Sequence, residues 1–508
     1  MKKNVKVVLE YCIVFLALLF VCFFVNRAIV IKGLYMDDLF HWAWYPGLSF
    51  YEFALKFYEG SGRYRPVFDG LQYLIYIIVG NNPLRFSIVN KVFNTIVAFF
   101  VYYFARRLNV KGAIAFLVSA FYLLAHFAYY QISQSIGTLE TCSLFIALMT
   151  LYFCMKLVGV TNHNVIEEES ARQKSKCINV FVIYLLYFLV CFTHERYLGL
   201  AVVIIFAILF SEKNLNKFKL ISLTVFIIEI LLICLLRYIA IGKVLPSGTG
   251  GTYVEETFKL VECIKFCFIQ VLFIFGINVG PDYLYGVDFF QMPGFKIKLL
   301  TGFSILVIFV IIVTYIYRRI KCSDNKNRLA ADVLFLTFIA MCIGASSVTI
   351  RVEMRFMYVS FIASVLYLAY MCQFISRSLK IDRIKIVPLA LFVIVFLSRV
   401  PIELRYRSFY NNIHCIVDLN RMNSLYDLTI GRYGVDEILH NKKIYILNKV
   451  YGMTNFYAEY FYKIYDKTNI GNKINLINEI TEIPESDLNE NTIIIFENYE
   501  TNVYTTLQ

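Results

Sequence analysis

Two adjacent aspartates, Asp37 and Asp38, are the first residues of this sequence whose type and position suggest chemistry. They directly follow an apolar stretch long enough to cross a bilayer, and they precede His41 and the two tryptophans, Trp42 and Trp44. A carboxylate can take a proton from a hydroxyl nucleophile or ligate a divalent cation. The pair therefore marks a candidate catalytic site beside a membrane, although the same residues could simply cap a helix starting at "LFHWAW".

Four further groups of charged residues lie near the ends of apolar segments. They are Arg63 and Arg65; Glu140; His194, Glu195 and Arg196 in "THER"; and Arg351, Glu353 and Arg355 in "RVEMR". Arginine binds phosphate through paired donors, so carboxylates and arginines together suit an acceptor hydroxyl and a phosphate leaving group. Lys91, inside an apolar segment, is a further candidate for lining such a cavity. The plainer alternative is that these arginines contact lipid headgroups or extend along the membrane surface.

The composition indicates a multi-pass membrane protein. Of the 508 residues, 59% are hydrophobic and 17% are charged, and the apolar residues form long unbroken runs. The net charge of +13 comes from Lys and Arg in short links between these runs, which is the pattern of membrane orientation and argues against nucleic-acid binding. The thirteen cysteines are scattered, which favours buried thiols over a disulfide or zinc framework.

The basic links orient about eleven predicted spans, with the amino terminus in the cytoplasm. In this arrangement 32–83 is a first outer loop, whose apolar part 67–79 lies along the surface, and 241–298 is an outer loop whose part 266–279 is re-entrant or interfacial. The predicted spans are 11–31, 84–104, 113–130, 141–157, 178–192, 197–210, 220–240, 299–317, 333–348, 356–374 and 384–397.

The last hundred or so residues differ in character from the rest. We predict a transmembrane module over 1–400 and a small extracytoplasmic α/β domain over 401–508, because "KIYILN" and "TIIIFE" are strand-like and flank a helix-like stretch. The sequence contains no P-loop, which argues against an ATP-driven pump.

This orientation puts all the charged clusters on the outer side of the membrane. The sidedness follows from the basic links and not from the clusters themselves, so their coincidence is informative. Charged residues at membrane depth usually face a cavity or a partner. We therefore expect the clusters to converge in one outer pocket.

An acidic pair after the first span, a long first outer loop, an acidic residue in the second outer loop and a terminal outer domain together resemble the GT-C fold glycosyltransferases. This superfamily includes the oligosaccharyltransferases, the protein O-mannosyltransferases and the lipid A aminoarabinose transferases. The resemblance implies that Asp37 or Asp38 is the catalytic base, that Glu140 occupies the second acidic position, and that Arg351 and Arg355 hold a lipid phosphate. The paired tryptophans of the oligosaccharyltransferase terminal domain are absent, which argues against transfer to an asparagine sequon.

The expected function is thus a membrane glycosyltransferase that moves a sugar from a polyprenyl-phosphate donor to a hydroxyl of a glycan, cell-wall polymer or protein. No cofactor is required, although Asp38 and Glu140 could ligate a divalent cation. The alternatives are a transporter or flippase of lipid-linked glycans, which would be expected to show repeated halves, and a glycan polymerase or ligase with a pyrophosphate-linked donor.

Overall fold

The structure is a computed structural model of the chain. It describes residues 2–56, 63–161, 169–211, 217–244, 259–279, 286–292, 294–321, 326–348, 353–447, 453–466, 473–498 and 503–506.

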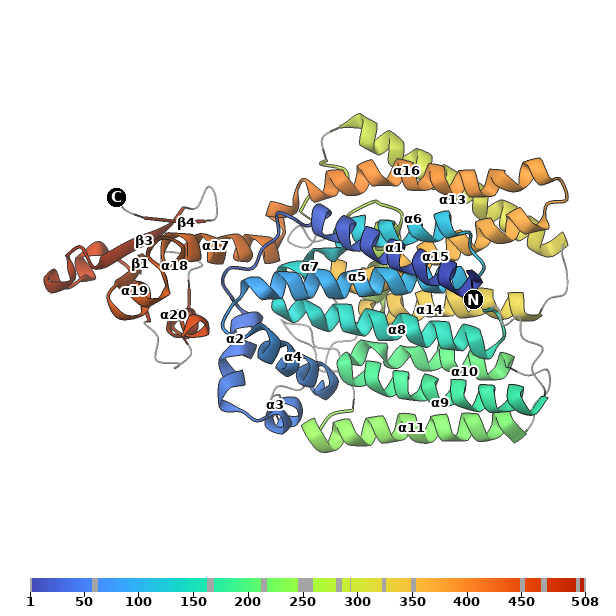
Figure 1. The fold of residues 1–508 in the computed structure, drawn as a ribbon, viewed down its shortest axis with the longest axis horizontal. Coiled ribbons are helices and arrows are strands. Elements are labelled where there is room, and N and C mark those ends of the chain that lie inside the picture. The colour runs from blue at the N-terminus through green and yellow to red at the C-terminus, as the bar shows by residue number, and fades with distance from the viewer. Residues whose placement is uncertain are drawn as a thin grey trace.

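A bundle of long apolar helices forms most of the molecule (Figure 1). A small red domain lies at one end of this bundle, and the amino terminus lies at the opposite end. The helices of the bundle are α1 (Lys2–Val25), α5 (Leu84–Arg107), α6 (Gly112–Leu124), α8 (Thr138–Leu157), α9 (Glu169–Thr193), α10 (Ala201–Phe210), α11 (Lys217–Ile241), α13 (Phe295–Lys321), α14 (Lys326–Ser347), α15 (Met354–Ser378) and α16 (Val387–Arg407).

The predicted class, a multi-pass helical membrane protein with a small terminal α/β domain, is confirmed. Within the described residues, nine helices are long and apolar enough to cross a membrane. A tenth span is broken, because α6 and the residues His126–Ser133 meet at 51°. The remaining predicted span, 197–210, is a 3-10 helix, Glu195–Leu200, followed by the ten-residue α10.

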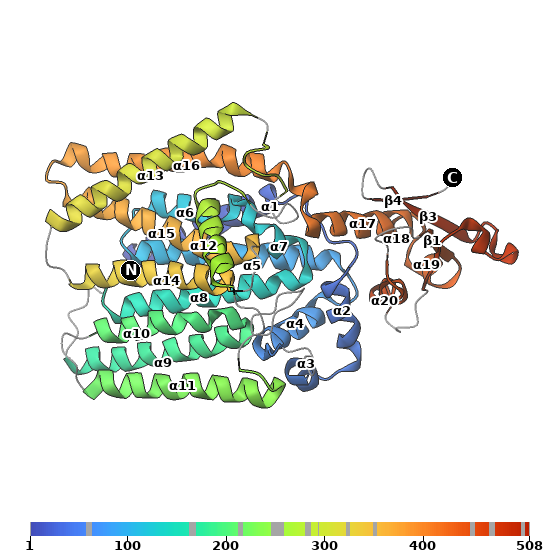
Figure 2. The same ribbon diagram turned by 180° about the vertical axis from the view of Figure 1, so that it is seen from behind.

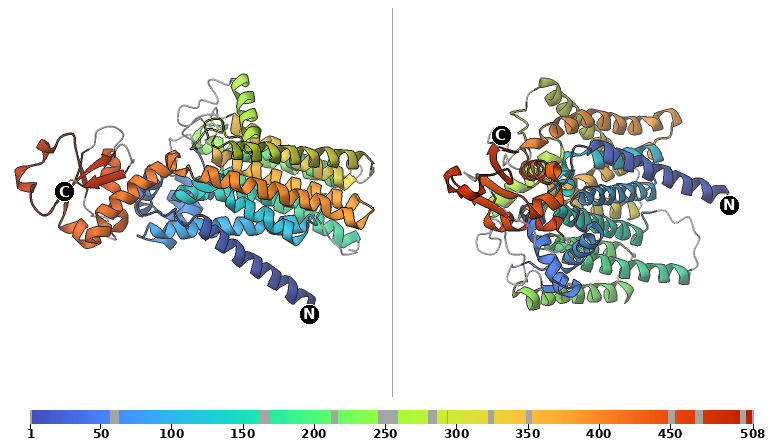
Figure 3. Two further views of the ribbon diagram at one scale, coloured as in Figure 1. Left: turned by 90° about the horizontal axis from the view of Figure 1, so that it is seen from above. Right: turned by 60° about the vertical axis from the view of Figure 1, so that its left-hand side comes forward.

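Two helices form the centre of the bundle. In the most apolar stretch of each candidate span, 83% of the residues of α8 and 89% of those of α15 are buried, more than in any other candidate span. The corresponding value for α1 is 11%. Figure 3 shows why, because α1 runs obliquely away from the other helices toward its amino-terminal end. Residues at the first turns of α8 and α15 are therefore held by the most rigid part of the fold.

Short helices cover the end of the bundle nearest the terminal domain. They are α2 (Asp37–Trp44), α3 (Phe50–Lys56) and α4 (Pro66–Val79). The predicted surface helix over 67–79 is thus present, and Pro66 at its first turn suits a helix start. Its exposed Leu74, Ile77 and Ile78 give it an apolar outer face, which is typical of a helix lying in a membrane interface.

The predicted re-entrant or interfacial segment is the helix α12 (Leu260–Ile274). Figure 2 shows α12 lying across α14 and α15, steeply inclined to the bundle axis. Its Gln270 donates to Ser347 Oγ at 2.7 Å and accepts from Ser346 Oγ at 2.7 Å, both on α14. These hydrogen bonds fix α12 against the bundle.

The terminal domain contains a four-stranded sheet in the order β2-β1-β3-β4. The strands are β1 (Lys443–Leu447), β2 (Ile474–Ile477), β3 (Thr492–Asn498) and β4 (Val503–Thr506), and only the β3–β4 pair is antiparallel. Helices α17 (His414–Leu428), α18 (Ile430–Tyr433), α19 (Val435–His440) and α20 (Asn455–Tyr460) complete it. The predicted domain boundary at residue 401 falls inside α16, which continues to Arg407.

The terminal domain touches the first loop. The rings of Tyr35 and Tyr457 are 4.9 Å apart, and those of Phe40 and Phe456 are 5.8 Å apart. Lys32 on the loop forms an ion pair with Asp427 at 2.7 Å. The residues on either side of the acidic pair are therefore packed against this domain.

Gly137 lies in a tightly packed turn just before α8. An added Cβ would clash with the carbonyl oxygen of Tyr130 and lie 2.7 Å from Gln131 Cα, and neither backbone atom can move easily. We expect Gly137→Ala to lower the free energy of unfolding by about 2 kcal/mol or more. Gly302→Ala on α13, where the Cβ would meet open space, should leave stability unchanged or slightly raised. Thermal unfolding in detergent measures both, and equal midpoints would contradict the prediction.

Candidate active site

A chain of ion pairs at the end of the bundle nearest the terminal domain brings together the first loop and the "THER" motif. Arg65 donates to both oxygens of Glu195, with distances of 2.8 Å from Nε and 2.7 Å from Nη2. Both side chains are buried. A bidentate pair of this kind is strong and geometrically specific. It fixes the residues before α4 to the turn between α9 and α10.

Glu140 is the centre of the cluster. This carboxylate, 1% exposed in the first turn of α8, forms a bidentate pair with Arg196, whose Nη1 donates to it at 3.2 Å. Its Oε1 also lies 3.7 Å from His194 Nε2 and 4.0 Å from Arg355 Nε. His194 Nδ1 lies 3.8 Å from Glu195, so it links Glu140 to the Arg65 pair.

Arg355 completes the cluster from the first turn of α15. It pairs with Glu353, and its guanidinium lies over the rings of Tyr130 and Phe356 at 4.3 Å and 5.0 Å. The Arg355 side chain is 21% exposed, more than that of Arg196 at 5%. Arg351 lies outside the described residues. We call Arg65, Glu140, His194, Glu195, Arg196, Glu353 and Arg355 the ion cluster.

The charges within the ion cluster balance. Burial opposes ionisation of Glu195, but the paired Arg65 holds its pKa well below the usual range. Burial alone would lower the pKa of Arg196, but Glu140 raises it above its ordinary value. Burial, with Arg65 and Arg196, lowers the pKa of His194 well below its ordinary value. Three arginines therefore face three carboxylates around a neutral histidine.

Asp38 is a structural anchor for the segment between α7 (Tyr129–Ser133) and α8. Its two carboxylate oxygens accept hydrogen bonds from the backbone N–H groups of Ser135, at 2.7 Å, and Ile136, at 2.8 Å. It thus caps the helical turn Ser135–Gly137 that leads into α8. The alternative that the pair caps the helix at "LFHWAW" is therefore wrong: α2 begins at Asp37, its N-cap Met36 makes no side-chain capping hydrogen bond, and Asp38 caps an element ninety-seven residues away in sequence.

Asp37 points elsewhere. It is exposed, and within the described part of the chain it forms no hydrogen bond or ion pair. Its charge acts on Tyr130, the ring beneath the Arg355 guanidinium, and on Tyr457 of the terminal domain. Asp37 therefore lies at the junction of the first loop, the terminal domain and the exposed side of the ion cluster. The preceding residue, Met36, has a φ of 51°, a strained backbone conformation of the sort found at functional sites.

The remaining predicted residues lie at the edge of the cluster or away from it. Arg63 and Arg65 act electrostatically on His41, whose pKa is lowered to about 3 by burial and then by these two charges. Lys91 donates to the carbonyl oxygen of Ile29 at 2.9 Å and lies near the Phe23 ring, so it joins α5 to α1. No interaction within the described residues links Lys91 to the ion cluster.

The two carboxylates considered as cation ligands already have partners. The oxygens of Asp38 face backbone N–H groups, and those of Glu140 face Arg196. In the described part of the chain no group of three or more His, Cys, Asp or Glu side chains could hold a metal ion.

Two features of this region were missed by the sequence reasoning. Asp69 in the first turn of α4 is 1% exposed, neither of its oxygens has a hydrogen-bond partner, and burial raises its pKa well above the ordinary value despite the nearby Arg65. Burial therefore opposes ionisation of Asp69, beside Arg65 of the cluster.

The other feature is a second buried network, at the broken span. His126 Nδ1 lies 2.5 Å from Glu403 Oε2, and Arg399 Nη2 donates to Glu403 Oε1 at 3.1 Å. Gly276, with a φ of +86°, leaves room for the Arg399 guanidinium, which a Cβ there would strike. The spacing of Arg399, Glu403 and Arg407, four residues apart each time, could have revealed a charged face on a continuing helix.

Comparisons with known proteins gave one kind of match. No protein-family model matches the sequence, and no curated protein sequence matches it. Among solved structures, the fold is similar to the apo crystal structure of the Archaeoglobus fulgidus oligosaccharyltransferase, with a TM-score of 0.46 and 12% identity. The match covers 93% of this chain and 65% of that one. This similarity is weak, and no activity follows from it.

The Arg65–Glu195 pair can be tested with a double-mutant cycle. Because either partner alone would leave an unpaired buried charge, Arg65→Met and Glu195→Met should each lower the free energy of unfolding by about 3–5 kcal/mol. The double variant should lose less than either single variant. Unfolding in detergent measures the cycle, and additive losses would mean that the two charges do not interact.

Asp38 makes stability depend on pH. Burial raises its pKa to about 7, from the ordinary value of 3.8, so the folded state holds the proton more tightly than the unfolded state. The contribution of Asp38 to stability is therefore fully present below the unfolded pKa and is lost as the pH rises through about 7. Relative to Asp38→Asn, the free energy of unfolding of the wild type should fall as the pH rises from the unfolded pKa of Asp38 to about 7, and it should change no further above that pH. Unfolding midpoints of both proteins across this range measure the effect, and parallel profiles would contradict it.

Proposed function

We propose that this chain is a membrane glycosyltransferase of the GT-C type, which transfers a sugar from a polyprenyl-phosphate donor to a hydroxyl acceptor. One arrangement carries the proposal. An exposed carboxylate, Asp37, lies next to Asp38, the anchor on the segment before α8. A partly exposed guanidinium, Arg355, lies over Tyr130 at 4.3 Å near that segment. A base beside an anion-binding group is the pairing that this reaction needs.

Asp37 is the proposed base, because Asp38 is committed to backbone hydrogen bonds. In the reaction Asp37 takes the proton from the acceptor hydroxyl, whose oxygen attacks the anomeric carbon of the donor sugar. The bond from that carbon to the phosphate oxygen breaks, and the phosphate leaves with the bonding electrons. A single displacement inverts the anomeric centre.

Arg355 is the proposed partner of the departing phosphate. It is the more exposed arginine on Glu140, and phosphate could replace Glu353 as its anion. The first turns of α8 and α15 lie on either side of this position, and helix amino termini favour negative charge. Arg196, deeper and bidentate with Glu140, would keep Glu140 from repelling the phosphate.

The first loop and the terminal domain are the proposed acceptor side. Asp37 lies beside Tyr457 and between the aromatic contacts that join α2 to α20. Aromatic surfaces suit the flat faces of sugar rings, so a glycan, cell-wall polymer or protein hydroxyl would approach here. With the amino terminus in the cytoplasm, as the basic links predict, this end faces the outside of the cell membrane.

Asp37→Asn should lower the rate of transfer by about 100- to 10,000-fold with little change in stability, because it removes the proposed base from an exposed position. Transfer can be measured in membranes supplied with radiolabelled polyprenyl-phosphate sugars. The matched control is Asp436→Asn, an exposed aspartate on α19, which should transfer at the wild-type rate. If a folded Asp37→Asn protein transfers as fast as this control, the assigned base is wrong.

A further inference from the structure

A polar cavity lies at the end of the bundle opposite the candidate active site, at helix ends that Figure 1 shows far from the terminal domain. Its volume is about 470 Å³, and it lies where the turns after α5 and α8 meet the start of α14 and the end of α15. The proposed transfer reaction does not use this cavity. Its polar lining consists of Asn109, Asn327, Arg328, Tyr370, Gln373, Arg377 and Ser378.

The two arginines make this cavity electropositive. Arg328 and Arg377 act on one another as like charges, and none of the described residues lining the cavity is acidic. Arg328 lies over the Phe374 ring at 5.1 Å, and Arg377 Nη2 donates to the carbonyl oxygen of Asn109 at 2.8 Å. Both guanidiniums are thus held at the cavity by neutral groups, which leaves their positive charge available to an anion.

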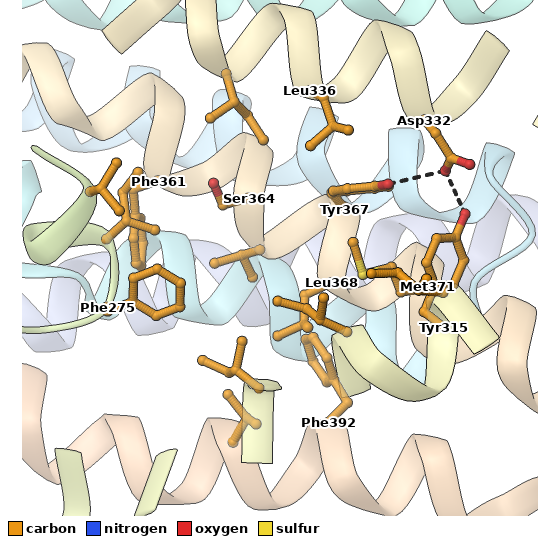
Figure 4. A pocket seen from close by; sticks show the side chains of 18 of the residues that line it. Phe275, Tyr315, Asp332, Leu336, Phe361, Ser364, Tyr367, Leu368, Met371 and Phe392 are labelled. Atoms are coloured by element: carbon orange, nitrogen blue, oxygen red, sulfur yellow. Dashed lines mark hydrogen bonds between the residues drawn. The ribbon is translucent and has the colours of Figure 1, made fainter. Parts of the chain in front are cut away.

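Asp332, an acid one turn after Arg328 on α14, is already paired. Asp332 Oδ2 accepts from Arg319 at 3.0 Å, and its Oδ1 accepts from Tyr367 at 3.1 Å and from Tyr315. Figure 4 shows Tyr315 and Tyr367 converging on this carboxylate. Asp332 therefore balances Arg319 and not the two arginines of the polar cavity.

A separate apolar cavity of about 530 Å³ is drawn in Figure 4, and ring contacts join its lining to that of the polar cavity. It lies among α12, α13, α14, α15 and α16, and its lining is almost entirely apolar side chains. Aromatic side chains separate the two spaces: the rings of Tyr367 and Tyr370 are 6.4 Å apart, and those of Tyr315 and Phe374 are 5.2 Å apart. A basic pocket at the ends of the spans, next to apolar space inside the bundle, matches the two parts of an anionic lipid.

We propose that the polar cavity binds a phosphate group, and that Arg328 and Arg377 are its ligands. The neighbouring apolar cavity favours the headgroup of an anionic phospholipid, drawn from the leaflet at the amino-terminal end of the bundle, over free phosphate. The site is separate from the proposed transferase centre and binds without any reaction.

The experiment uses the full chain, purified in detergent and depleted of lipid. Inorganic phosphate, phosphatidylglycerol or phosphatidylcholine is added, and the unfolding midpoint and the retained lipid are measured. We expect phosphatidylglycerol to bind and to raise the midpoint more than phosphatidylcholine. Arg328→Gln with Arg377→Gln should weaken this binding by about tenfold or more for each arginine removed, since each provides charge-assisted hydrogen bonds.

Matched variants separate loss of the site from loss of the fold. Arg383→Gln removes an exposed charge just after α15, at the same end of the bundle but outside the cavity lining, and should bind as the wild type does. Arg328→Lys with Arg377→Lys keeps the charge and should retain most of the binding. Arg377→Gln alone changes an exposed residue, so it tests the site even if the double glutamine variant does not fold.

The two sources of phosphate give different results. If inorganic phosphate protects as well as phosphatidylglycerol does, the ligand is free phosphate; if only the lipid protects, it is a headgroup. Equal behaviour of phosphatidylglycerol and phosphatidylcholine without any effect of phosphate would overturn the proposal, as would full binding by a folded double glutamine variant. None of these readouts depends on sugar transfer, so the transferase proposal stands or fails separately.

Discussion

The end of the bundle nearest the terminal domain depends on the ion pairs of one buried carboxylate, Glu140. It lies at the start of one of the two most buried helices and faces arginines from two other segments, Arg196 and Arg355. Removing these charges from water is costly, and only close pairing offsets that cost. The helices α8 and α15 and the turn before α10 therefore have one favourable relative position. The first loop joins them through Arg65 and Glu195. The ion cluster therefore fixes four segments of the chain relative to one another.

A second set of buried charges lies between the segments of the ion cluster and the terminal domain. Glu403 on α16 holds His126 at the break after α6, and Arg407, one turn further along, donates to the carbonyl oxygens of Leu123, Leu124 and Ala125. These bonds satisfy the backbone groups that the break exposes, which a membrane interior would otherwise penalise heavily. Because α16 leads directly toward α17 and the sheet, the terminal domain is attached to the same broken span that carries Tyr130.

The convergence of the charged clusters could be predicted from sequence, because the basic links give each span a direction and long apolar runs leave few alternatives. The separate roles of Asp37 and Asp38 could not, since they depend on where Ser135 and Ile136 present their N–H groups. Lys91 illustrates a different limit: a lysine in an apolar run must find a partner, but the sequence did not reveal that this is the carbonyl oxygen of Ile29. The predicted boundary at residue 401 falls within α16, and the sequence did not reveal that Arg407 still faces buried partners on that continuous helix.

The helical geometry of α2 has a consequence for how this protein can vary. Successive residues on an α-helix point about 100° apart, so one step along the backbone separates a buried anchoring carboxylate from a solvated one. The short link before the pair is held at both ends, by the ion pair of Lys32 with Asp427 and by the hydrogen bonds of Asp38. Loss of a single residue between Gly33 and Met36 would therefore pull the anchor off its N–H groups. Length in this short link is therefore constrained more tightly than residue identity, and related chains should tolerate substitutions here far better than insertions or deletions.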